Sequence, residues 1–256
     1  MEPRPVIEAL ARWLHVFAGI IWIGHLYFFN WVNGPFAATM DKDTKQKVVP
    51  ELMPRALFWF RWGAAWTWIL GYTLLGMVFY MAKSTLFEGF PMHEWGMASG
   101  VMALLVLVAP FLYDALAKSI KNNQQLAIAG IIIVGGLMFL YTEAAHFTYR
   151  AAQIHLGATF GTIMAFNVWF RIWPLQQKII TAVKAGQAPD AAWAATAGGR
   201  SKHNTYMSVP LIYAMLNTHT SALNVGSYNI STVVVVAAGW LLTQWMYKKS
   251  ATVKGF

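Results

Sequence analysis

Long apolar runs alternate with short polar segments along this chain, and the length of the runs predicts its elements. Windows of about 20 mainly apolar residues, enough for a helix to cross a hydrocarbon core of roughly 30 Å, occur seven times. The predicted spans are Leu10–Val32, Ala56–Met81, Trp95–Ala117, Leu126–His146, Ile154–Trp173, Tyr206–Val225 and Ile230–Tyr247. We therefore expect an all-α fold, a polytopic transmembrane helix bundle of about seven spans, with residues 1–256 forming a single integral membrane domain.

The polar segments between the runs are short, and the two longest are Asn33–Arg55 and Pro174–Asn204. Glycine and proline interrupt the second segment, which predicts one or two surface helices joined by turns. Neither segment is long enough to be a soluble catalytic domain. Candidate functional residues are therefore sought within the spans.

The basic residues of these segments predict the orientation of the bundle. Fifteen of the 19 Lys and Arg residues fall on one side of the expected topology, and Arg4, Arg12, Lys83 and Arg150 fall on the other. Because basic loops stay on the cytoplasmic side, we expect the N-terminus outside and the C-terminus inside. This bias accounts for the net charge of +9, so we expect no binding to nucleic acid.

Composition agrees with a lipid environment and narrows the chemistry. The chain is 57% hydrophobic and only 11% charged, whereas soluble domains carry about 25% charged residues. Cysteine is absent, which excludes disulfides, thiolate iron–sulfur ligation and covalent haem attachment. A redox centre would have to use His, Met, a carboxylate or a non-covalent cofactor.

Histidines inside the apolar runs are the main candidates for function, because an ionisable ring in hydrocarbon usually faces the bundle interior and serves a ligand or proton path. His15, His155 and His219 lie on three different predicted spans, near the expected outer side. His25 and His203 lie towards the inner side, together with Arg61. The histidines thus form an outer group and a weaker inner one.

Imidazoles at similar depth on different helices are what a membrane haem b requires, since the macrocycle fits between helices and imidazole nitrogens hold its iron axially. We therefore predict one or two haem b groups, with His15, His155 and His219 as candidate ligands at the outer site. His25 and His203 are weaker candidates at an inner site. Gly19, one turn from His15, would allow the ring to approach closely.

Other interpretations of the same residues stay open. Each buried histidine would also fit an interhelical hydrogen bond, and His15, His155 and His219 would suit copper or zinc. His146 is a weaker metal candidate, because capping of a helix end explains it equally well. Arg61 would pair either with Asp114 or with a haem propionate.

Several motifs taken together resemble the membrane domain of the cytochrome-c-linked urate oxidases, the urate oxidase N-terminal domain family. The similarity covers most of the chain, in the same order, and its last two motifs are quite specific. The motifs are Trp13–Val16 with Gly19–Gly24, Phe58–Trp62 leading to Thr67–Trp68, Ile154–Ala158 with Gly161–Val168, Ser201–Tyr206, and Leu216–His219.

This resemblance implies a multi-pass protein of the bacterial inner membrane that oxidises urate and passes electrons to cytochrome c. It places His15, His155, His203 and His219 on the family's histidine positions, and His25 does not clearly match one. In that family a haem-c domain follows the membrane region, whereas this chain ends at Phe256 without cysteine. We therefore expect that a separate cytochrome takes that role or that the chain serves another redox partner.

Urate chemistry would require a cationic cradle for the substrate anion. Candidates for it on the outer side are few: Arg12 and Arg150, with Glu143 or a histidine that binds no metal as the base. The preferred interpretation is therefore a haem b electron-transfer subunit of a redox complex. The alternatives are a urate oxidase that passes electrons to cytochrome c or a quinone, and a copper-handling membrane protein.

Overall fold

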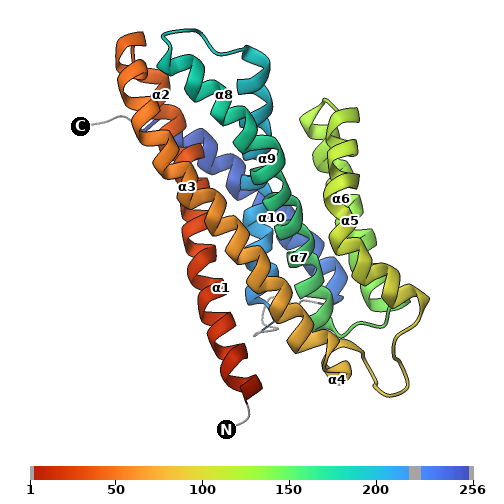
Figure 1. Ribbon diagram of the computed structural model, residues 1–256. Coiled ribbons are helices and arrows are strands. Elements are labelled where there is room, and N and C mark those ends of the chain that lie inside the picture. Colours follow the sequence, from red (N-terminus) through yellow and green to blue (C-terminus); the bar gives the residue numbers. More distant parts are fainter. Residues whose placement is uncertain (1–2, 219–225, 254–256) are drawn as a thin grey trace.

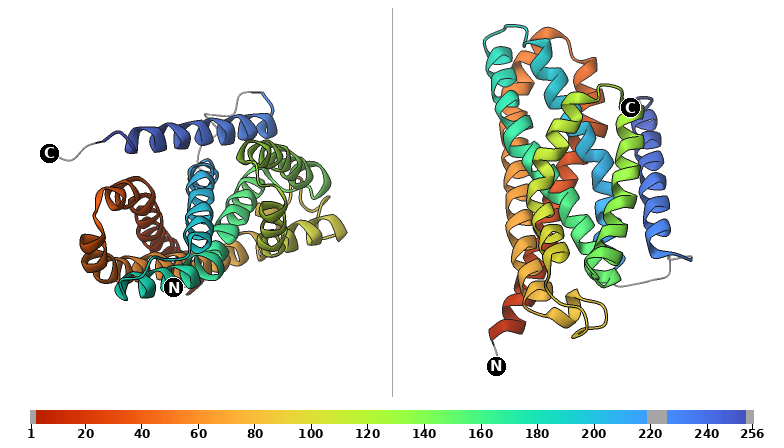
Figure 2. Two further views of the ribbon diagram at one scale, coloured as in Figure 1. Left: turned by 90° about the horizontal axis from the view of Figure 1, so that it is seen from above. Right: turned by 90° about the vertical axis from the view of Figure 1, so that its right-hand side faces the viewer.

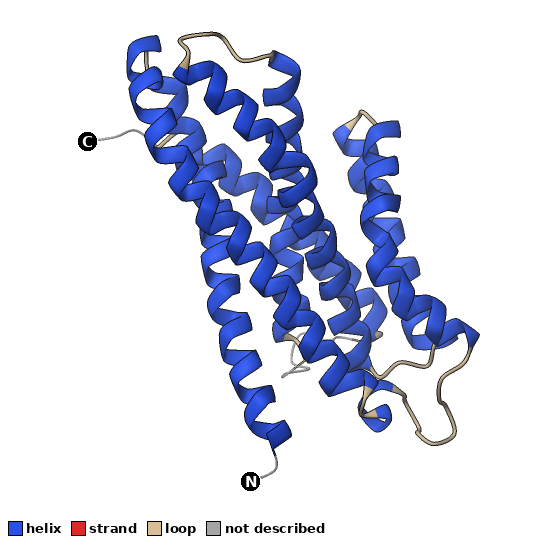
Figure 3. Cartoon of the chain, in the orientation of Figure 1, coloured by secondary structure: helices blue, strands red, loops and turns tan. Residues whose placement is uncertain are grey.

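The protein is a bundle of long, mostly antiparallel helices in its computed structural model, which describes residues 3–218 and 226–253 (Figure 1). Helices and short connections make up the described residues, and their one β-bridge joins Phe87 to Phe147 (Figure 3). The α-helices are α1 (Pro3–Tyr27), α2 (Gly34–Thr39), α3 (Lys42–Leu75), α4 (Lys83–Leu86), α5 (Met97–Ser119), α6 (Asn123–Phe139), α7 (Tyr149–Asn167), α8 (Trp173–Lys184), α9 (Ala191–Leu216) and α10 (Tyr228–Ser250).

Four π-helical segments continue the ends of long helices: η1 (Phe28–Asn33), η2 (Gly76–Tyr80), η3 (Leu140–Ala144) and η4 (Val168–Ile172). Such segments are rare and frequently lie at functional sites. Two of them, η2 and η3, belong to the end of the bundle that contains α4, which we call the α4 end. The other two belong to the opposite end, the α2 end (Figure 1).

The all-α prediction is confirmed, and five helical stretches are long and apolar enough to cross a membrane. They are Arg4–Thr39, Lys42–Tyr80, Met97–Ser119, Asn123–Ala144 and Tyr228–Ser250. Large apolar side chains on these stretches face outward, such as Trp13, Ile20 and Ile132 with 67%, 67% and 68% of their surface exposed. An apolar exterior of this extent suits a lipid bilayer.

The two remaining predicted spans, Ile154–Trp173 and Tyr206–Val225, coincide with α7 and the second half of α9 and are not among these five stretches. Polar residues lower the hydropathy of both helices. Neighbouring helices can accommodate such residues, and α7 in particular is largely enclosed by protein. Thirteen of the residues of α7 are buried, His155 and Asn167 among them. Seen from above, α9 lies inside the bundle with α10 along one side, and it contacts α1, α7, α8 and α10 (Figure 2).

Two helices begin well before the predicted spans. α3 begins at Lys42, where the sequence predicted a polar loop, and α9 begins at Ala191. Each has an aspartate cap that satisfies backbone N–H groups of the first turn: Asp41 accepts from Thr44 N at 2.8 Å, and Asp190 accepts from Ala192 N at 2.8 Å. Apolar length therefore predicted the apolar part of these helices and not their starts.

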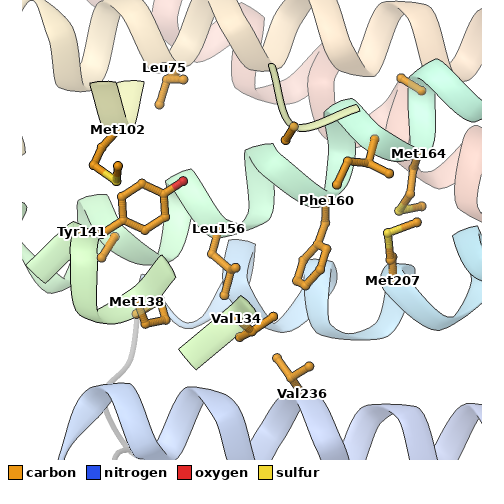
Figure 4. Close-up of a cluster of buried hydrophobic side chains, with 14 of the residues drawn as sticks. Leu75, Met102, Val134, Met138, Tyr141, Leu156, Phe160, Met164, Met207 and Val236 are labelled. Atoms are coloured by element: carbon orange, nitrogen blue, oxygen red, sulfur yellow. The ribbon is translucent and has the colours of Figure 1, made fainter. Parts of the chain in front are cut away.

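The core lies around α7, which contacts α3, α4, α5, α6 and α9. Its side chains Leu156, Phe160 and Met164 lie in one cluster with residues from several other elements in Figure 4, among them Leu75 of α3 and Val236 of α10. Gly157 and Gly161 of α7 allow close contact with α9. A Cβ on Gly157 would lie 3.4 Å from Ala214 Cβ, and one on Gly161 would lie 3.5 Å from Leu211 Cδ1, both on α9.

Candidate functional site

His155 is the most enclosed histidine of the described chain. It lies on the first half of α7, which starts where the Thr148 hydroxyl accepts a hydrogen bond from Ala151 N at 3.1 Å. Its residue surface is 0% exposed. A ring so deeply buried needs partners within the protein, because an unpaired polar group in an apolar interior is costly.

Four aromatic rings surround His155. The ring centroids of Phe147, Tyr141, Tyr80 and Phe79 lie 4.7, 5.6, 5.7 and 6.4 Å from that of the histidine. Tyr80 and Phe79 belong to η2 and Tyr141 to η3, so both π-helical segments of the α4 end point aromatic residues at one imidazole. We call this group of four rings the His155 cage.

Hydrogen bonds determine the tautomer of His155. Its Nδ1 lies 2.7 Å from the Ala151 carbonyl oxygen. A carbonyl only accepts, so Nδ1 carries the proton and Nε2 keeps a lone pair. The Tyr80 hydroxyl, 3.2 Å from Nε2, therefore donates to it. A histidine that binds a metal through one nitrogen usually donates its other N–H in this way.

A turn at His146 closes the cage towards the α4 end. His146 has a φ of 52°, in the left-handed region, and the next N–H, of Phe147, bonds to Tyr141 O at 2.9 Å. This geometry ends a helix, so the backbone of His146 lies at a helix end, as the capping interpretation expects. The turn places Phe147 against His155, and the bridge from Phe147 to Phe87 covers it with a second loop.

His15 lies on the face of α1 that packs on α3. Its Nδ1 is 2.9 Å from Thr67 O, so it also donates from Nδ1 and leaves Nε2 as an acceptor. A Cβ on Gly71 would lie 3.0 Å from the ring, and one on Gly19 would lie 3.8 Å from the Thr67 methyl group. The small residues near His15 therefore bring α1 and α3 together.

The structure does not bring His15 and His155 to one level. His15 lies beside Gly71, whereas His155 lies beside Tyr80, nine residues further along α3 and η2. At 1.5 Å per residue this corresponds to about 13 Å along the bundle. Two imidazoles that share one metal hold it at about 2 Å each, so these two rings would serve different sites.

His219 lies outside the described residues, so its predicted place beside His155 or His15 stays a prediction. Among residues 3–218 and 226–253, no cluster of three or more His, Asp or Glu side chains is arranged to hold a metal ion. The copper or zinc alternative therefore also stays a prediction.

The inner candidates lie on separate elements. His25 bonds through Nδ1 to Ile21 O at 2.7 Å and packs beside Phe29, with ring centroids 6.3 Å apart. His203 of α9 shares a hydrogen bond of 2.7 Å with the Tyr113 hydroxyl. These contacts leave the two histidines with different partners.

Arg61 is held by aromatic residues. Its guanidinium carbon lies 4.1 Å from the centroid of Trp173, and its carbonyl oxygen accepts from Trp169 Nε1 at 3.1 Å. The alternative pairing with Asp114 is not formed. Cation–π contact takes its place in the described structure.

The weak catalytic candidates differ in their surroundings. Glu143 is exposed and accepts a hydrogen bond of 3.1 Å from the Thr142 hydroxyl. Arg150 lies over Phe79, 5.8 Å from the ring centroid, and its buried Nε has no hydrogen-bond partner within the described part of the chain. Arg150 thus contacts the His155 cage at Phe79, and this ring separates it from His155.

A second polar group lies at the α2 end, around Asp114 of α5. Arg171 donates to both of its carboxylate oxygens, at 2.9 and 2.7 Å, and Arg200 donates at 2.7 Å. Lys118 Nζ lies 2.8 Å away. The group joins α5, η4 and α9. Sequence reasoning missed it, although a polar run from Arg200 to Asn204 within a helix was the available signal.

Comparison with known proteins adds a family. A sequence profile described as "Urate oxidase N-terminal" matches residues 39–255, which is most of the chain and includes α3 to α10. No curated protein and no solved structure matches the chain.

Proposed function

Because the chain belongs to the urate oxidase N-terminal family, we propose that it is a membrane-embedded electron-transfer subunit of a bacterial redox complex and that it holds haem b. Its place is the inner membrane, with seven crossings, the α4 end outside and the α2 end inside. Its redox partner is a separate cytochrome c or another subunit.

One observation carries this proposal: His155 is fully buried within an aromatic cage, its Nδ1 proton is fixed on Ala151 O, and its Nε2 is an acceptor that takes the Tyr80 hydroxyl in the absence of a metal. These features fit a haem, whose iron takes a neutral imidazole nitrogen and whose apolar macrocycle packs against aromatic rings. When bound, the haem would supply one-electron transfer.

The residues have distinct parts in this proposal. His155 would hold the haem iron of the outer site through Nε2, and the Ala151 carbonyl keeps the imidazole in the required tautomer. His219 is a further candidate ligand of that iron. His15, with the same tautomer about 13 Å deeper, is the candidate ligand of a second group. The surrounding rings exclude water from the cage.

Oxidation of urate is the second candidate function, and Arg150 favours it. A buried guanidinium nitrogen without a partner is suited to a substrate anion, and this one lies beside the ring of Phe79 that flanks His155. The electrons would then pass to cytochrome c or a quinone.

Reduced-minus-oxidised absorbance of the purified protein in the α-band region tests the haem proposal. We expect a haem b signal in the unmodified protein and its loss, or a large reduction, in His155→Ala. His93→Ala is the matched control, since His93 lies in a loop at the α4 end and stacks on His146, with centroids 4.0 Å apart. A protein supplied with haem that shows no signal would contradict the proposal.

The same preparations separate the alternatives. Consumption of urate with added cytochrome c or quinone, abolished in Arg150→Ala, would support the enzyme. Stoichiometric copper in a protein without haem would instead favour copper handling.

A further inference from the structure

A cavity of about 280 Å³ lies at the α2 end, among η1, α3, η4, α8 and α9. We call it the Ser201 cavity, after a lining residue of α9 that lies about one helical turn from Gly198, which also lines it. Its apolar walls come from Phe29, Leu57 and Phe60. The volume is near the lower limit of ligand pockets, roughly 300 Å³, so the cavity accepts a single small ring and is too small for a macrocycle.

Both π-helical segments of this end line the cavity: η1 supplies Phe29, Asn30 and Asn33, and η4 supplies Ile172. The α9 wall is built from small residues. A Cβ on Gly198 would find no atom within 4 Å, so the space in front of this glycine is open. Rare helical geometry and small side chains thus combine to keep this space empty of protein.

Hydrogen-bonding groups that the protein does not use face the cavity. Ser201 Oγ accepts from Asn30 Nδ2 at 2.8 Å, which leaves its own hydroxyl proton without an acceptor in the described residues. The side-chain amide of Gln176 has no partner there either, and Asn33 uses only its Nδ2, towards Met53 Sδ at 3.6 Å. The cavity therefore offers donors to a carbonyl-bearing ligand.

Charge and location restrict the ligand further. None of the described residues that line the cavity is charged, and burying a charge without a partner is costly, so the ligand is uncharged. On the outside at this end, Phe36 of α2 and Phe58 of α3 expose 52% and 44% of their surface, which suits lipid. The end of the bundle that holds the cavity therefore also presents apolar side chains to its surroundings.

We propose that the Ser201 cavity binds the head group of a membrane quinone, an uncharged planar ring with carbonyl acceptors. The Ser201 hydroxyl and the Gln176 amide donate to its carbonyl groups, and Phe29 and Phe60 pack on the ring. Phe29 also contacts His25, the inner haem candidate. The role of the quinone as a redox partner rests on the proposed electron-transfer function. Its binding is argued from the cavity alone.

Equilibrium titration of the purified protein with a short-chain ubiquinone tests the binding directly. We expect saturable binding to the unmodified protein. Gly198→Leu, which fills the cavity, should weaken it at least tenfold, and Ser201→Ala about two- to tenfold through one lost hydrogen bond. Gly199→Leu is the matched control, because a Cβ there also meets no atom within 4 Å while the residue does not line the cavity; its affinity should be unchanged.

Absence of saturable binding, or equal affinity in Gly198→Leu and the unmodified protein, would overturn the inference. So would displacement of the quinone by uracil, a water-soluble uncharged ring, at lower concentration than the quinone itself requires. The binding assay is read without reference to haem. Quinone binding without an α-band would reject the haem proposal and keep this site, and the converse result would reject the site and keep the haem.

Discussion

Asp114 is the carboxylate that pairs with three cations at the α2 end: Lys118, Arg171 and Arg200. Its side chain is 8% exposed and that of Arg200 is 9% exposed, while Arg171 and Lys118 retain 30% and 64% exposure. The two more exposed cations can regain water if the carboxylate is lost. Arg200 cannot, because its surroundings are protein, including the Tyr113 ring 5.0 Å from its guanidinium carbon.

Asp114→Asn should therefore destabilise the protein strongly. Removing one partner of a buried ion pair leaves an uncompensated charge and costs about 3–5 kcal/mol, which would lower the thermal midpoint by about 10 °C. Thermal unfolding in detergent, followed by tryptophan fluorescence, measures this. Glu51→Gln is the control: the pair of Glu51 with Arg55 is 72% exposed on both sides and should contribute less than about 1 kcal/mol. Equal midpoints for the two variants would contradict the argument.

Among the elements, α1 and α3 bring their backbones close together at Gly63. A Cβ there would lie 3.0 Å from Trp22 N and 3.2 Å from Trp22 Cα. The obstacle is backbone, which cannot move aside as the end of a side chain can. One glycine thus fixes the distance at which α1, with His15 and His25, packs on α3.

Gly63→Ala should push the two helices apart and destabilise the protein by about 1–3 kcal/mol, the usual cost of overpacking. Gly24→Ala serves for comparison, because a Cβ at Gly24 meets nothing within 4 Å; it should be neutral or stabilising, since alanine favours a helix by up to about 1 kcal/mol. Chemical denaturation of both variants gives the difference. If Gly63→Ala proved as stable as Gly24→Ala, the close packing of α1 on α3 would be wrong.

For the whole molecule, the length of the apolar runs predicted the bundle but only part of its candidate site. The helices were predictable because each presents a long apolar run, whereas the capped start of α3 at Asp41 is polar and was expected to be a loop. His155 was predictable as an ionisable ring in an apolar run. Its partners Tyr80, Tyr141 and Phe147 were not, because two π-helical segments and the left-handed turn at His146 place them, and such local geometry leaves no periodic signal.

The orientation can be tested with single cysteines, since the chain has none of its own. Ser84 at the α4 end and Ser119 at the α2 end are both exposed. In bacterial spheroplasts, a membrane-impermeant maleimide should label Ser84→Cys directly and Ser119→Cys only after lysis, because the basic α2 end should face the cytoplasm. The reverse labelling pattern would show the bundle to be inverted.

The enclosure of α7 by other helices has a consequence for how the protein is made. A segment with Gln153, His155 and Asn167 on its surface is poorly suited to enter lipid by itself, because polar groups are expensive in hydrocarbon. It must leave the translocon against neighbours synthesised before it, and the fit is completed only when α9 follows. Assembly around α7 is thus complete only after α9 has been made, and a ribosome that stalls before α9 would leave an unfinished chain for the membrane proteases.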